Sequence, residues 1–499
     1  MGKTLYPGAS MTTPPRLFFQ SETFAADAGR RRRPATDESV SEAARDIPLH
    51  ARCDVLVVVG GPSGVAAAVA AARQGAHTIL MERHNHLGGL STGGLVIWID
   101  RMSDWTGRLV IRGFAEEFLA RLPASAKAGP PPAAWGARDA ATAAWWAART
   151  SAFHGTVTHS PTCDPEVMKL AAQEMVLEAG AELLFHAWGA EPILAGNTVR
   201  GVFFESKQGR RAILAGCVVD ATGDGDLFAR AGAAFDADVD EHDIHHCMNT
   251  SWLFGGVNMP RYQRWRARQP AAFSAFLQAG RARIRLFEKA FASWRDDVAL
   301  FMGPRLAGYS AVDVEDLTAV EIQSHRLMTQ HLTLYREGAP GFENAFLMLS
   351  APQLGVRHAR RLRGVAAVTR GDWDGRVRED EIGVSPSLAP KFANVSVPYG
   401  ALVPAALDGL LAAGRHISCD PSSHSFLREI PQCWLTGQAA GVAAALAVAG
   451  GLAPRAVPVA AVQAALRMGG AYLSAQPAAS IPSEAPARAA ATVDASRMM

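Results

Sequence analysis

The sequence predicts an α/β fold in which one domain is built on a parallel sheet and a second, inserted domain is of the α+β kind. Residues 54–59 form a β-branched run that ends in a glycine-rich turn, and a helix of small residues follows over 65–74. Another apolar run at 78–82 completes a β-α-β unit. Continuous apolar strands of this kind are typical of a parallel sheet buried on both faces, so the arrangement is Rossmann-like.

Later segments extend the same pattern. The helical and strand periodicities predict a helix over 164–179, a strand over 181–185, hairpin arms over 199–205 and 211–214, a strand over 216–223, a strand over 409–414 and a helix of tiny residues over 437–449. Because the late strand and helix again resemble parts of a parallel sheet, the chain is expected to return to its first domain.

The domain organisation follows from these elements and from composition. With 499 residues and 49% hydrophobic residues, the chain is long enough to bury a large core. The predicted divisions are a flexible extension over 1–44, the first part of the sheet domain over 45–230, a substrate domain over 231–395, the C-terminal part of the sheet domain over 396–473 and a disordered tail over 474–499.

Charge and cysteine content exclude several classes of function. The formal charge is +2, from 49 basic and 47 acidic residues, so binding to nucleic acid is disfavoured. The six cysteines form no C-x-x-C pair and are interpreted as reduced and mostly buried. The longest apolar candidate for a membrane span, 55–72, is interrupted by a Gly-Gly-Pro-Ser-Gly turn. Polar residues follow the basic run 30–33, which argues against export, so we expect a cytoplasmic protein without membrane partners.

The first β-α-β unit has the features of a dinucleotide site. A glycine turn between strand and helix lets backbone N–H groups and the positive end of the helix dipole face a pyrophosphate. Glu82, at the end of the second strand, is placed to accept hydrogen bonds from a ribose. A purely structural glycine turn is the alternative. The turn residues are Gly60, Gly61, Pro62, Ser63 and Gly64.

One residue of the turn departs from the G-x-G-x-x-G pattern, because Val59 occupies the position of the first glycine. If the turn requires a positive φ there, a β-branched residue costs about 1–3 kcal/mol. Cofactor binding is then weakened rather than abolished, and Val59→Gly is expected to raise the affinity.

Several motifs together resemble a known family. They are Asp54-Val-Leu-Val-Val-Val-Gly-Gly-Pro-Ser-Gly64, Glu82-Arg83 with Leu87-Gly-Gly89 and Thr92-Gly-Gly94, Asp220-Ala-Thr-Gly-Asp224, Gly355-Val-Arg-His-Ala-Arg-Arg361, and Ala413-Gly-Arg415 through Gly437-Gln-Ala-Ala-Gly441. Over residues 45–470 the chain resembles the FAD-dependent oxidoreductases of the glutathione-reductase-like fold. His358 departs from that resemblance, since such proteins often carry an acidic residue at its position.

The resemblance implies that the sheet domain binds FAD. Gly60, Gly61, Pro62, Ser63 and Gly64 are then expected at the pyrophosphate, Glu82 at the ribose, and Arg83, Gly88, Gly89 and Thr92 along the cofactor toward the flavin. Asp224, Gly414 and Arg415 are expected at strand ends facing the cofactor, and Gly437, Gln438, Ala439 and Ala440 at the start of a helix aimed at the flavin. The positive end of such a helix stabilises negative charge on reduced flavin.

Catalytic candidates lie in the loop before that helix. His424 is a candidate proton acceptor, with a hydrogen-bonded structural histidine as the alternative, and Arg428 is a candidate for binding a carboxylate or the flavin, with an ion pair to Glu429 as the alternative. Arg357 and His358 are weaker candidates.

Other polar and aromatic groups are given structural interpretations. Arg360, Arg361 and Arg363 are interpreted as a solvated helix face. Glu241, His242, His245 and His246 are read as a polar turn rather than a metal site, and no metal is predicted. Five tryptophans are interpreted as core or interface residues, with a substrate lid as the alternative: Trp98, Trp105, Trp135, Trp145 and Trp146.

The leading hypothesis is an FAD-dependent oxidoreductase that transfers hydride between a small organic substrate and flavin N5. No second glycine-rich β-α-β unit follows the first, so electrons are expected to pass to or from dioxygen or a separate carrier. The alternatives are a flavin-dependent modifier of tRNA, which the near-neutral charge disfavours, and a flavin-binding scaffold without turnover, which Val59 motivates.

Overall fold

The computed structural model describes residues 37–237, 247–284 and 286–474. Its main sheet has seven strands in the order β7-β2-β1-β10-β9-β8, and β21 also pairs with β10. Strands β7, β2, β1, β10 and β21 run parallel, whereas β9 and β8 extend the sheet as an antiparallel meander. The bounds are β7 Glu182–Leu184, β2 Thr78–Met81, β1 Leu49–Val58, β10 Arg211–Asp220, β9 Thr198–Glu205, β8 Trp188–Ala195 and β21 Leu410–Ala412.

The predicted β-α-β unit is confirmed. The last four residues of β1 are fully buried and pair with β2, and α1 (Pro62–Arg73) connects the two strands. Helix α1 begins three residues before the predicted start because Pro62, whose φ suits a first helical turn, already belongs to it. The two segments predicted as separate strands at 211–214 and 216–223 form the single strand β10.

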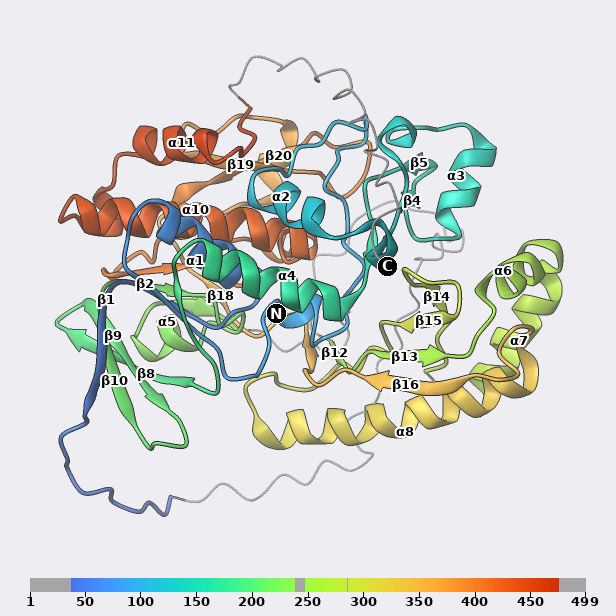
Figure 1. Ribbon diagram of the computed structural model, residues 1–499, viewed down its shortest axis with the longest axis horizontal. Coiled ribbons are helices and arrows are strands. Elements are labelled where there is room, and N and C mark those ends of the chain that lie inside the picture. Colours follow the sequence, from blue (N-terminus) through green and yellow to red (C-terminus); the bar gives the residue numbers. More distant parts are fainter. Residues whose placement is uncertain (1–36, 238–246, 285, 475–499) are drawn as a thin grey trace, which may run out of the picture.

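A long apolar helix, α10 (Ile430–Ala449), packs across α1 beside the sheet (Figure 1). Glycines make this contact close. A Cβ on Gly437 would lie 2.1 Å from the carbonyl oxygen of Ser63, and a Cβ on Gly441 would lie 2.1 Å from that of Ala67. The prediction that this helix starts near Gly437 is therefore wrong: it starts two turns earlier, and the small residues of its middle are used for helix packing.

The inserted domain is built on a four-stranded sheet in the order β14-β15-β13-β16, and Figure 1 shows the long helix α8 running beside β16, with α6 and α7 at one end. Its core includes Trp252, Phe301 and Tyr335. The bounds are β13 Trp252–Gly255, α6 Met259–Arg268, α7 Pro270–Arg283, β14 Phe291–Ala292, β15 Val298–Phe301, α8 Val314–Gly338 and β16 Phe346–Ser350.

The remaining elements connect or cover these two sheets. They are α2 Phe114–Arg121, β3 Lys127–Ala128, α3 Ala140–Ala147, β4 Ala152–Phe153, β5 Thr156–Val157, β6 Thr162–Cys163, α4 Pro165–Glu178, α5 Asp226–Arg230, β11 Phe235–Asp236, β12 Met248–Asn249, β17 Gly355–Val356, β18 Arg361–Leu362, β19 Glu381–Ser385, β20 Val395–Pro398, α9 Pro421–Leu427 and α11 Val459–Met468.

Along the chain, the inserted domain ends before the predicted boundary at residue 395. Val368, Trp373 and Ile382 belong to the same hydrophobic core as α1 and α10, so the chain has already returned to the first domain before β19. Arg360, Arg361 and Arg363 do not form the expected helix face, because this stretch contains the short strand β18.

One helix in the described part of the chain, α10, is long and apolar enough to cross a membrane. However, 83% of its 18-residue apolar window is buried inside the protein, as in the core helix of a globular domain.

Candidate functional site

The glycine turn after β1 leaves open space at one residue and none at another. A Cβ on Gly64 would lie 1.9 Å from the carbonyl oxygen of Val59, so α1 packs too closely against the turn for any side chain there. By contrast, a Cβ on Gly61 would meet nothing within 4 Å. Gly61 is also the N-cap of α1, and no side chain caps the helix. The first N–H groups of α1 therefore face an open cradle, as anion binding requires.

Glu82 closes the other side of the turn. Its carboxylate accepts hydrogen bonds of 2.8 Å from the backbone N–H groups of Gly60 and His84. Burial raises the pKa of Glu82, and these two hydrogen bonds oppose that shift. Each carboxylate oxygen retains a lone pair for a further donor, which suits the ribose role implied by the resemblance.

Val59 has the strained backbone that its position in the motif predicts, with φ at +77°. Such a conformation is rare for β-branched residues, because the side chain crowds the backbone. The strain is present in the folded protein whether or not a cofactor is bound.

Val59→Gly is expected to raise the free energy of unfolding of the apoprotein by about 1 kcal/mol, because relief of the strain exceeds the lost packing of the side chain. We also expect the affinity for FAD to rise by up to about tenfold, because a glycine lets the turn close more tightly on the cofactor. Urea denaturation and a flavin titration measure the two effects. Val59→Ala is the control, since it loses the same packing but keeps a Cβ; equal gains in both variants would contradict the strain argument.

The segment after β2 folds back onto the glycine turn. Gly88 donates a 2.8 Å backbone hydrogen bond to Gly60, and the Thr92 hydroxyl donates a 2.6 Å hydrogen bond to the carbonyl of Leu87. A Cβ on Gly89 would lie 2.8 Å from the Cα of Gly61. This segment, which contains the short 3-10 turn Gly89–Ser91, therefore forms one wall of the cradle.

The end of β21 and the helix α10 meet the same turn. The Ser63 hydroxyl donates a 2.9 Å hydrogen bond to the carbonyl of Ala413, and Gly414, with φ at +110°, donates its N–H to the Thr436 hydroxyl at 3.1 Å. The Ser63 side chain is thus engaged within the protein, and only its backbone N–H is left for a pyrophosphate role.

Asp224 and Arg415, predicted from separate segments, form an ion pair of 2.5 Å. Gly223, at φ +76°, leaves the room that this arginine occupies, since a Cβ there would lie 2.4 Å from its Nη1. The structure therefore brings these two predicted residues together.

Two groups of predicted cofactor residues lie elsewhere. Gly437, Gln438, Ala439 and Ala440 are buried in the interior of α10. The Gln438 side chain accepts a hydrogen bond from the Phe114 N–H and donates one to the Gly469 carbonyl, so it joins elements rather than facing a cavity. Arg83 is exposed and lies over the Trp188 ring, with 4.8 Å from Cζ to the ring centroid.

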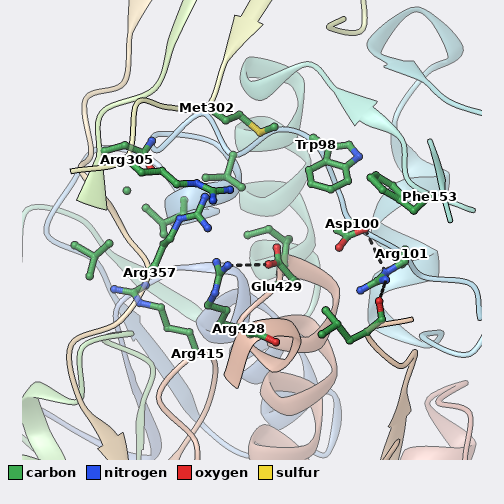
Figure 2. A pocket seen from close by; sticks show the side chains of 18 of the residues that line it. Trp98, Asp100, Arg101, Phe153, Met302, Arg305, Arg357, Arg415, Arg428 and Glu429 are labelled. Atoms are coloured by element: carbon green, nitrogen blue, oxygen red, sulfur yellow. Dashed lines mark hydrogen bonds and ion pairs between the residues drawn. The ribbon is translucent and has the colours of Figure 1, made fainter. Parts of the chain in front are cut away.

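A cavity of about 710 Å³ lies between the sheet domain and the inserted domain (Figure 2). Glu429 and Ile430, at the start of α10, contribute to its wall, so the first turn of this helix, rather than Gly437–Ala440, borders the cavity. Pockets of about 300–1,000 Å³ accommodate small molecules and parts of cofactors. Apolar lining residues include Leu90, Val96, Trp98, Phe153 and Met302.

The charged residues of the cavity wall are mostly arginines. Two carboxylates, Asp100 and Glu429, line it together with five arginines. Figure 2 shows the ion pairs of Asp100 with Arg101 and of Glu429 with Arg428, both at 3.4 Å. The arginines are Arg101, Arg305, Arg357, Arg415 and Arg428.

Asp100 is a functional candidate that the sequence analysis missed. Burial raises the pKa of Asp100 to about 6; Arg101 and Arg428 oppose this shift, and Glu429 adds to it. A carboxylate with such a pKa, at the wall of a cavity, has the properties of a proton acceptor near neutral pH. Nothing in the sequence distinguishes Asp100, because its raised pKa results from burial and from neighbouring charges.

The two predicted catalytic residues have different positions. Arg428 lines the cavity, and burial lowers its pKa while Glu429 opposes that effect. His424, one turn earlier on α9, is buried and its ring packs edge-on against His358 at 5.0 Å between centroids. His424 is not among the described residues that line the cavity, in contrast to the position expected of a proton acceptor.

The structural interpretations of other residues have mixed outcomes. All six cysteines are free, and five are buried, as predicted. Of the five tryptophans, Trp98 lines the cavity, while Trp145 is 57% exposed. No group of three potential metal ligands occurs among the described residues. Glu241, His242, His245 and His246 lie outside them.

These features define a dinucleotide-binding α/β protein with a second domain over the site, and the residues fit FAD: an open cradle at Gly61, a carboxylate at the end of β2 and a cavity at the start of α10. The family model described as FAD dependent oxidoreductase matches residues 54–466, so the chain belongs to this family and is an FAD-dependent enzyme. No curated protein matches the chain.

Three of the solved structures that match the chain are enzymes or enzyme-like proteins. They are a geranylgeranyl bacteriochlorophyll reductase-like protein from Thermoplasma acidophilum (13% identity, 84% of this chain and 83% of that chain, TM-score 0.39), p-nitrophenol 4-monooxygenase from Pseudomonas putida (9%, 84% and 84%, 0.41) and a myxobacterial chondrochloren halogenase (12%, 84% and 79%, 0.42).

Proposed function

We propose that the protein transfers hydride between a small organic substrate and N5 of non-covalently bound FAD, in the cytoplasm, with dioxygen or a separate electron carrier as the second redox partner. The observation that carries the proposal is the open cradle at Gly61 together with the cavity at the start of α10, which Leu90 of the cradle wall and Arg415 also line. Bound FAD supplies the hydride acceptor or donor.

The residues proposed to hold the cofactor fall into three sets. The backbone N–H groups of Gly61, Ser63 and Gly64 bind the pyrophosphate, and Glu82 binds the ribose. The wall formed by Gly88, Gly89 and Thr92, with the Asp224–Arg415 pair, borders the path to the cavity. The first turn of α10 replaces Gly437–Ala440 as the part of that helix nearest the flavin.

The substrate's proton requires an acceptor, and we propose Asp100 for this role. Its carboxylate lines the cavity and is held by Arg101, and burial favours its protonated form more than in water. Arg428, fixed by Glu429, is proposed to orient the substrate or the flavin. His424 is proposed to support the wall from behind through its contact with His358.

The test is the colour of the purified protein and its response to substrates. We expect a yellow protein whose flavin absorbance is bleached under anaerobic conditions by members of a small-molecule set. A colourless protein that FAD does not reconstitute would overturn the proposal. A yellow protein that no compound bleaches would favour the flavin-binding scaffold, which the strained turn at Val59 motivates.

A further inference from the structure

The inserted domain contributes a pair of arginines to the cavity. Arg305 follows β15, and Arg357 follows β17, whereas Arg415 and Arg428 come from the sheet domain. In Figure 2 the side chains of Arg305 and Arg357 extend toward each other on one side of the cavity, opposite Trp98 and Phe153. Both arginines line the cavity and lie outside the segments proposed to hold the cofactor, so this pair is available to a substrate.

Three of the arginines that line the cavity are paired with a carboxylate of the protein. Arg101, Arg415 and Arg428 each form an ion pair with a carboxylate. Within the described ranges, no carboxylate forms an ion pair with Arg357. A guanidinium at the wall of a cavity, beside a second one, is stabilised by an anion that accepts its hydrogen bonds.

Arg305 lies close enough to Arg357 for the two positive charges to repel each other. Arg305 is 6% exposed, and burial lowers its pKa to about 9, with the charge of Arg357 acting in the same direction. The nearby Glu288 opposes the shift of Arg305, but burial raises the pKa of that carboxyl as well. An anion that contacts both guanidiniums would offset the repulsion between them.

The opposite wall is apolar and aromatic. The rings of Trp98 and Phe153 lie 5.4 Å apart between centroids, and Met302 borders the same space. A ligand that satisfies both walls has an anionic end and an apolar body.

We propose, on the basis of the flavoenzyme function above, that the substrate is an organic carboxylate whose anionic end binds Arg305 and Arg357 and whose apolar body packs against Trp98 and Phe153. The planar guanidinium fork matches a carboxylate in two-point hydrogen bonding, which a lysine would not provide. Asp100 lies on the aromatic side of the cavity, below Trp98 in Figure 2, and is then closer to the body of the substrate than to its carboxylate.

The experiment is a titration of the FAD-containing protein with 3-phenylpropionate and with its neutral amide, followed by the flavin difference spectrum. We expect the carboxylate to bind at least about tenfold more tightly than the amide, because a hydrogen bond to a charged group is lost with the amide. Arg357→Gln is expected to weaken carboxylate binding by about tenfold or more and to leave amide binding unchanged.

Arg336→Gln is the matched control, since it makes the same change on the exposed side of α8. Arg305→Gln provides a second variant, and flavin content with melting temperature shows that each variant is folded. Equal binding of carboxylate and amide, or an unchanged preference in Arg357→Gln, would overturn the inference.

The outcome is distinguishable from failure of the proposed function. If neutral compounds bleach the flavin and carboxylates neither bind nor bleach it, the substrate class is wrong while the oxidoreductase function stands. If carboxylates perturb the spectrum with the expected arginine dependence but nothing bleaches the flavin, the binding inference stands and the proposed turnover is wrong.

Discussion

Asp100→Asn is expected to lower the rate constant for substrate-dependent flavin reduction by about 10²–10⁴-fold at pH 8, because it removes the proposed proton acceptor. Bound FAD should be retained, since Asp100 is not among the residues proposed to hold it. Anaerobic stopped-flow measurement of flavin bleaching gives the rate constant, and the ratio of flavin to protein absorbance gives the FAD content.

The pH dependence of the same reaction has a defined sign. A proton acceptor works in its ionised form, and burial raises the pKa of Asp100 to about 6. The rate should therefore be full above this pH and fall as the pH is lowered through about 6. Asp100→Asn should lose this dependence together with the rate.

Glu429→Gln serves as the comparison for Asp100, because Glu429 is the second carboxylate on the cavity wall and is paired with Arg428. We expect a smaller loss in this variant and a retained pH profile. A full rate with an unchanged profile in Asp100→Asn would contradict the assignment of the proton acceptor.

Gly61→Ala and Gly64→Ala form a matched pair with opposite expected effects. The Cβ of Gly61→Ala enters open space, so we expect unchanged stability of the apoprotein but a loss of FAD affinity of about tenfold or more, as the methyl group crowds the pyrophosphate. The Cβ of Gly64→Ala would strike the carbonyl of Val59, so we expect a loss of about 1–3 kcal/mol in the free energy of unfolding.

Flavin titration and urea denaturation of the apoproteins measure these effects. Gly371→Ala is the control for adding a methyl group, since a Cβ there makes only an ordinary contact of 3.4 Å with the Thr369 hydroxyl. If Gly61→Ala binds FAD as tightly as the parent protein, the open cradle is not the pyrophosphate site.

The residues of the site that could be predicted are those whose pattern lies within one short segment of the sequence. The β-α-β unit, the glycine turn and Glu82 could be recognised because a buried strand, a turn and a helix follow one another within 30 residues and each has its own pattern. Even the strain at Val59 was visible, because the motif requires a backbone conformation that valine rarely adopts.

The errors concern an element boundary and the places of some side chains: Arg360, Arg361 and Arg363 lie in or beside a strand rather than on a helix, and His424 is not among the described residues that line the cavity. The sequence predicts that α10 starts near Gly437, because the run of tiny residues is the strongest helical pattern there. Pro431, in the first turn, marks the observed start. The small residues are explained by the close approach of α1, which a single segment of sequence does not reveal.

By itself, the sequence determined the family, the sheet, the glycine turn and its acid, because these depend on residues close together in the chain. Only the tertiary structure decided that Asp100 and the arginine pair Arg305–Arg357 share one cavity while His424 lies behind its wall. The physical reason is that burial and opposing charges set the chemistry of these side chains, and both arise only when segments more than 200 residues apart along the chain pack around the same space.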